Sequence, residues 1–154
     1  MAVLISNDAG LDPLIGPAEI EAAVCATLAA EGVERPVEVS VSFVDAHEMQ
    51  GLNRAWRDID APTDVLSFEC DGVNDDLSAM TLAEDPVYEL GDVIIAPDVA
   101  ARQTREFGTS FEEEISLLLV HGLLHLCGYD HIADDEAEVM EKREAEILEA
   151  WSKR

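Results

Sequence analysis

Apolar and polar residues alternate along parts of the chain with a period of two, the spacing of a strand with one buried face. The clearest case is "PVEVSVSFV", residues 36–44, where every second side chain is apolar. Three other short apolar runs predict further strands. They lie at residues 2–7, within residues 61–70 after a proline turn, and at residues 88–97, where Pro97 ends the run.

Elsewhere the apolar residues are three or four positions apart, the spacing of amphipathic helices. Residues 17–31 fit this pattern, with Pro17 suited to the first turn and Gly32 to the carboxyl-terminal cap. The acidic, weakly periodic segment 71–86 predicts an exposed loop. Four more helices are predicted at residues 46–56 (after a capping Asp45), 98–108, 109–128 and 134–151.

The helix predicted at residues 109–128 has the strongest signature. Thr109 or Ser110 can cap it, and the acidic residues of its first turn complement the helix dipole. Its second half is almost entirely apolar up to Gly128, so it should be buried on most sides. In the last helix Glu144 interrupts an apolar stripe, which predicts that part of that face stays wet.

This order of elements predicts an α+β fold, with one domain over residues 1–154. A mixed sheet of about four strands would pack with about five helices around the buried helix 109–128. Hydrophobic residues make up 48% and charged residues 28% of the chain, as in an ordinary globular protein. Because no stretch resembles a membrane span or a signal peptide, we expect a cytoplasmic protein.

The three cysteines, Cys25, Cys70 and Cys127, are widely spaced and form no CxxC pair. Such a sparse, odd count argues against a disulfide framework and fits a reducing compartment. Cys127 lies among candidate metal ligands, but we interpret it as a small buried hydrophobic residue, because the neighbouring histidines alone complete a ligand set.

The formal net charge is −25, from 34 acidic and 9 basic residues. This charge argues against a nucleic-acid-binding protein, because phosphate binding depends on clustered lysine and arginine. It can instead reflect a solvated surface that favours solubility.

Three of the four histidines lie in "HGLLHLCGYDH", residues 121–131. His121 and His125 are four positions apart, so a helix puts both imidazoles on one face. Gly128 lets the chain fold back through a left-handed residue, which can bring His131 to the same point. Three imidazoles plus water form an open tetrahedral site for one Zn²⁺, although nickel or cobalt would accept the same ligands.

The spacing of these histidines equals that of the metzincin zinc peptidases, H-E-x-x-H-x-x-G-x-x-H. The glutamate that serves there as the general base is replaced by Gly122. Without this carboxylate the usual route to water-mediated peptide cleavage is missing, so a peptidase takes second place among the candidate functions. His47 belongs to no cluster and is expected to be an exposed helix residue.

The same segment resembles H-G-x-L-H-L-x-G-Y-D-H, the signature of the YbeY family of bacterial endoribonucleases, which are tied to ribosomal RNA maturation. Two further segments, "LNRAWRDIDAPTDVLSF" (52–68) and "LGDVIIAP" (90–97), are similar to other stretches typical of that family. The resemblance implies a zincin-like α+β fold with His121, His125 and His131 as zinc ligands.

The resemblance also implies a metal-dependent endoribonuclease, a hydrolase that acts on ester bonds. Its substrate would be single-stranded ribosomal RNA, cut in maturation of the 16S rRNA 3′ end and in ribosome quality control. The expected partner is the small ribosomal subunit, with ribosome-associated proteins as further candidates. No membrane and no small-molecule cofactor are expected.

The family's functional arginine falls on Arg57. A planar guanidinium can bind two phosphate oxygens and stabilise the charge that builds there during cleavage. Arg54, Asp58 and Asp60 make its surroundings a mixed patch. Zinc would activate a water molecule or polarise the phosphoryl oxygen as a Lewis acid, and the sequence leaves open whether water or the 2′-hydroxyl attacks.

Asp130 has three interpretations that the sequence leaves open. It can orient a ligand histidine by accepting its second ring proton, which we favour, or it can cap the final helix or a turn. A third role, general base, ranks below both. Asp92 is interpreted as structural, closing a strand or a hydrogen bond near the site.

Three competing functions remain at the level of the sequence. The first is a zinc peptidase-like hydrolase whose general base comes from elsewhere in the chain. The second is a non-catalytic ribosome-assembly factor in which zinc only holds the fold. A metal-storage protein is the third, and one compact site disfavours it.

Overall fold

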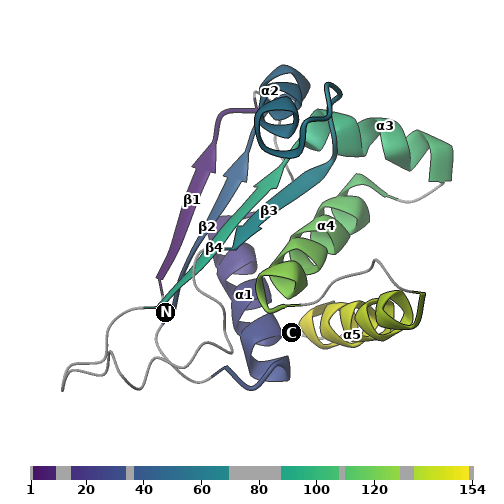
Figure 1. Cartoon of the computed structure of the whole chain (residues 1–154). Helices are drawn as coiled ribbons and strands as arrows, with labels where there is room; N and C mark the ends of the chain where they lie inside the picture. The colour runs from purple at the N-terminus through teal and green to yellow at the C-terminus, as the bar shows by residue number, and fades with distance from the viewer. Residues whose placement is uncertain are drawn as a thin grey trace.

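The computed structural model describes residues 2–9, 15–33, 37–69, 88–107, 110–128 and 134–152. Within these ranges four strands form one mixed sheet, as predicted, and their order in the sheet is β1-β2-β4-β3 (Figure 1). The first three strands of that order run parallel, and β3 is an edge strand antiparallel to β4. The strands are β1 (Ala2–Asn7), β2 (Val37–Phe43), β3 (Val65–Glu69) and β4 (Tyr88–Ile95).

Five helices are described, in agreement with the predicted number. They are α1 (Pro17–Ala30), α2 (Ala46–Arg57), α3 (Pro97–Phe107), α4 (Phe111–Leu126) and α5 (Asp134–Ser152). Pro97 opens α3 and β4 already stops at Ile95, so the strand predicted at residues 88–97 ends before this proline. The predicted acidic loop at residues 71–86 lies outside the described residues.

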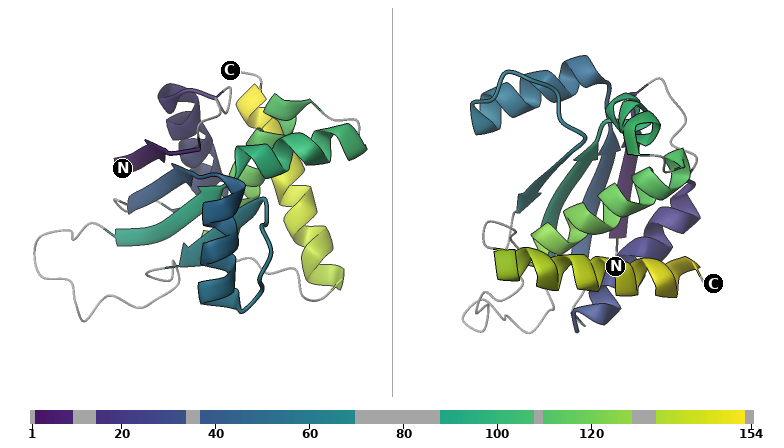
Figure 2. Two further views of the ribbon diagram at one scale, coloured as in Figure 1. Left: turned by 90° about the horizontal axis from the view of Figure 1, so that it is seen from above. Right: turned by 90° about the vertical axis from the view of Figure 1, so that its right-hand side faces the viewer.

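One face of the sheet carries the main core (Figure 1). The apolar residues of the alternating segment in β2 are all buried on this face, because successive side chains of a strand point to opposite sides. Helices α1 and α4 lie on it, and α5 packs across these two helices (Figure 2). The alternation of apolar and polar residues in β2 therefore determines which face of the sheet packs against the helices.

Helix α2 packs at one end of the sheet against side chains of the opposite face. Its buried Met49 forms a smaller core with Val44, Leu66 and Ala96. On the edge strand β3, Val65 packs against the main core while Leu66 belongs to this smaller one. Helices α4 and α2 thus contact opposite faces of the same strand (Figure 2).

Gly122 lets α4 approach the sheet closely. A Cβ added at this position would lie 2.7 Å from Val93 Cγ1 and 3.5 Å from Val65 Cγ2. The sequence explained this glycine only as the absent glutamate of a peptidase motif. Its position against β4 adds a packing reason, because a larger side chain would push α4 away from the strand.

The chain contains no helix, among the residues described, that is long and apolar enough to cross a membrane.

Candidate functional site

Helix α4 begins and ends where the sequence predicts. Ser110 caps it by accepting a hydrogen bond from the Glu113 backbone N–H at 3.1 Å, and the last helical residue is Leu126. Gly128 follows with φ +103°, a conformation that glycine adopts without strain. Gly128 therefore has the positive φ angle that the sequence predicts for reversing the chain after α4.

His121 and His125 project from the same face of α4, as their spacing predicts. Their Nε2 atoms are 3.1 Å apart, and the two rings meet edge to face with centroids 4.6 Å apart. Both side chains are half-buried. Two imidazole nitrogens converge here on one point in space.

The second ring nitrogen of His121 contacts a residue that the sequence analysis did not assign to the site. His121 Nδ1 is hydrogen-bonded to Glu144 Oε1 of α5, 23 residues along the chain. Glu144 is only 7% exposed, so the prediction that this part of the α5 face stays wet is wrong. A carboxylate interrupting an apolar stripe was the available signal, since such a group is buried only with a partner.

The histidine pair fits a metal ion. Two nitrogens held about 2.0–2.1 Å from one tetrahedral zinc are about 3.3–3.4 Å apart, close to the distance between these Nε2 atoms. The bond to Glu144 leaves Nε2 as the nitrogen of His121 available for coordination. The third predicted ligand, His131, and Asp130 lie outside the described residues, within which no group of three or more candidate ligands converges.

Cys127 lies in the main core and is not placed to supply a thiolate. Burial, reinforced by the charges of Glu31 and Glu69, raises the pKa of its thiol to about 12. The thiol therefore stays protonated near neutral pH, in agreement with the interpretation of Cys127 as a small buried hydrophobic residue.

Arg57 occupies the exposed last turn of α2, the helix that packs on the other face of β3 from α4. No ion pair involves it among the described residues. Arg54, one turn earlier, has Nη1 3.7 Å from Asp60 Oδ1, and both side chains are about two-thirds exposed. Trp56 between them is 69% exposed and touches Phe68 of β3 edge to face. His47 is an exposed residue of the same helix, as predicted.

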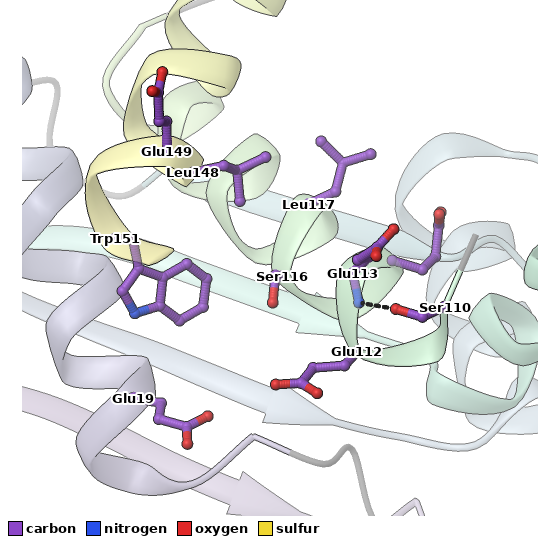
Figure 3. Close-up of a pocket in the computed structure, with 10 residues that line it drawn as sticks. Glu19, Ser110, Glu112, Glu113, Ser116, Leu117, Leu148, Glu149 and Trp151 are labelled. Atoms are coloured by element: carbon purple, nitrogen blue, oxygen red, sulfur yellow. Dashed lines mark hydrogen bonds between the residues drawn. The ribbon is translucent and has the colours of Figure 1, made fainter. Parts of the chain in front are cut away.

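A pocket of about 740 Å³ lies at the far end of α4 from His125, beside the end of α5 (Figure 3). Five glutamates and Trp151 contribute to its lining. This concentration of carboxylates repels a polyanion, so the pocket does not suit RNA. The glutamates are Glu19, Glu112, Glu113, Glu114 and Glu149.

Comparison with known proteins identifies close relatives. The family model described as Endoribonuclease YbeY matches residues 16–152. The Endoribonuclease YbeY of Caldanaerobacter subterraneus subsp. tengcongensis is 42% identical over 158 residues, covering 97% of this chain and 96% of that protein. That of an Exiguobacterium species is 43% identical over 118 residues, or 77% of this chain and 75% of the relative.

The fold also has a solved counterpart. The solution structure of TM1509 from Thermotoga maritima superimposes with a TM-score of 0.58 at 28% sequence identity. The match covers 98% of this chain and 92% of that one. These comparisons confirm the resemblance that the three sequence segments indicated.

Proposed function

The chain belongs to the YbeY family of endoribonucleases, and from that premise we propose that it cleaves single-stranded segments of ribosomal RNA with the help of one zinc ion. Its biological task would be maturation of the 16S rRNA 3′ end and ribosome quality control. The ion would be held by His121, His125 and His131.

One observation of the structure carries the metal part of this proposal. Two imidazole Nε2 atoms converge at 3.1 Å, and the opposite nitrogen of one ring is already hydrogen-bonded to a buried carboxylate. Histidine ligands in metal sites show this same division between their two nitrogens. When bound, zinc would supply Lewis-acid polarisation of the scissile phosphate, and nickel or cobalt would suit the same donors.

Arg57 would hold the phosphate. Its exposed guanidinium can form two parallel hydrogen bonds to phosphate oxygens and offset the charge that grows on them during cleavage. Because α2 and α4 pack on opposite faces of β3, a phosphate that meets both Arg57 and the ion would lie at this edge strand.

Asp130 remains a proposed contributor. Since Glu144 already accepts a hydrogen bond from His121, an orienting role for Asp130 would concern one of the other two ligand histidines. The general-base role would require the Asp130 carboxylate to reach the water or hydroxyl that attacks.

A net charge of −25 opposes binding of free RNA, so the ribosomal small subunit or divalent cations would bring the substrate to the enzyme. Binding to isolated, non-ribosomal RNA should accordingly be weak at low magnesium. Tight binding under those conditions would show that the local positive charge of Arg54 and Arg57 on α2 (the α2 surface) outweighs the net negative charge of the whole chain.

A cleavage assay tests the activity. Zinc-loaded protein is incubated with single-stranded ribosomal RNA fragments, with small ribosomal subunits and with casein. We expect cut RNA and intact casein, loss of cutting with a chelator, and its return on addition of zinc. Digestion of casein would instead support the peptidase-like alternative. A peptidase needs a carboxylate as general base, and the motif position that would supply it is Gly122. Glu144 does not replace it, because its carboxylate contacts Nδ1 of His121, the nitrogen that faces away from the proposed metal position.

A second experiment separates catalysis from assembly. If the ion is catalytic, His131→Ala should abolish RNA cleavage, and it should lower the melting temperature by no more than the stabilisation that zinc binding adds to the wild type. Collapse of the fold would favour an assembly factor with structural zinc. Mapping 16S rRNA 3′ ends in a strain without the protein tests the biological half, since normal ends would exclude a role in that maturation step.

A further inference from the structure

Glu144 is a buried carboxylate in a helix face that is otherwise apolar. Met140, Ile147 and Trp151 lie on the same stripe of α5 and belong to the main core. An ionised carboxylate in such surroundings loses its hydration, and this cost has to be offset by the partner that it contacts. The packing of α5 alone therefore gives no reason for a glutamate at this position.

The contact that Glu144 makes determines the state of a proposed metal ligand. A carboxylate accepts hydrogen bonds, so its contact with His121 Nδ1 assigns that nitrogen as the donor of the ring. In the neutral ring the lone pair then lies on Nε2, the atom that faces His125 Nε2. Glu144 lies beside Nδ1 and so is not placed to be a ligand itself.

We propose that Glu144 is a positioning residue of the metal centre. It fixes the ring orientation and tautomer of His121, so that Nε2 coordinates the ion, and it ties the last helix of the chain to that centre. This inference rests on the proposed metal function. The inference has a consequence for folding. Metal binding should stabilise the packing of α5 on α4, because Glu144 of α5 binds one nitrogen of the His121 ring while the ion binds the other.

The first test measures zinc affinity by competition with a chromogenic chelator. Glu144→Leu, which removes the acceptor and keeps an apolar volume, should weaken zinc binding about 10- to 100-fold, the usual effect of losing such a partner. Glu144→Gln retains an acceptor oxygen and should recover most of the affinity. Glu141→Ala, which removes an exposed carboxylate one turn earlier on the same helix, should bind zinc like wild type.

The second test separates positioning from a general structural role. Without zinc, Glu144→Leu loses the contact with His121 but also removes the cost of burying a carboxylate, so its urea midpoint should stay close to that of wild type. With zinc, long-range ¹H–¹⁵N spectra should show His121 protonated at Nδ1 and metal-bound at Nε2 in wild type. The leucine variant should lose this single tautomer.

The outcomes distinguish the two proposals. Zinc affinity in Glu144→Leu equal to wild type, or coordination of zinc through His121 Nδ1, would overturn the positioning role alone. A loss of affinity matched by an equal loss of stability in the zinc-free protein would assign Glu144 to structure and overturn it as well. A wild-type chain that binds no zinc would overturn the metal function and this inference together.

Discussion

The histidine pair on α4 and the arginines on α2 belong to helices on opposite faces of the edge strand β3, and the fold holds them very differently. His121 is fixed between His125 and the buried Glu144. Arg57 is exposed and has no ion pair among the described residues. The α4 site is therefore preorganised, while the α2 surface offers accessible charge.

This difference matches what the two proposed tasks, metal binding and phosphate binding, require. A metal ion needs donor atoms at fixed positions, which burial and a hydrogen-bonded second nitrogen provide. A phosphate on a moving polymer needs a cation that can reach it, and a long exposed side chain does so at little cost in desolvation. Substitutions in the two regions should therefore affect different measurements.

The largest effect is expected from removing a ligand. His125→Ala deletes one of the two converging nitrogens and should weaken zinc binding more than about a hundredfold, beyond the loss expected for a supporting partner. Equilibrium dialysis with zinc measures this. His47→Ala, which removes an exposed imidazole from α2, is the matched control and should bind zinc normally. Equal affinity in both variants would mean that the α4 pair is not a metal site.

The two regions also differ in how tightly their helices pack, and one substitution made in both tests this. Gly122→Ala places a Cβ 2.7 Å from Val93 Cγ1 and should lower the free energy of unfolding by about 1–3 kcal/mol. Gly51→Ala on α2 meets nothing within 4 Å and should raise it by up to about 1 kcal/mol, through helix propensity. Urea unfolding measures both, and the same sign at the two positions would contradict the difference in packing.

Arg57→Ala should reduce RNA cleavage and leave zinc affinity unchanged. Hydrogen bonds to charged groups contribute about 1.5–3 kcal/mol, so kcat/KM should fall roughly 10- to 150-fold. Arg54→Ala removes a cation already paired with Asp60 and should have a smaller effect. Cleavage by Arg57→Ala at the wild-type rate, with zinc saturating, would show that the α2 surface takes no part in the chemistry.

The sequence predicted those features that depend on local pattern. Alternation in residues 36–44 identified the buried face of β2, and Ser110 and Gly128 marked the limits of α4. The four-residue spacing of His121 and His125 was enough to place both rings together, because helix geometry is regular.

Features that depend on tertiary packing were beyond the sequence. Glu144 meets His121 only because α5 folds back across α4, so the interrupted apolar stripe alone predicts an exposed position. The face on which Arg57 lies follows from the pairing of β3 with β4 and from the packing of α2, neither of which is encoded in a short motif. The packing role of Gly122 likewise appears only beside Val93.

The smallest predicted effect concerns the exposed charges beside Arg57. Asp60 contacts Arg54 and accepts a hydrogen bond from Gln50 Nε2 at 3.0 Å. Asp60→Asn should raise affinity for single-stranded RNA by no more than about fivefold, because exposed ion pairs are weak, and it should not change zinc affinity. Since salt screens exposed charges, the gain should shrink as ionic strength rises, as titrations by fluorescence anisotropy at two salt concentrations would show. A gain that persists at high salt would mean that the α2 surface holds RNA by fixed geometry, and the contrast with the α4 site would no longer hold.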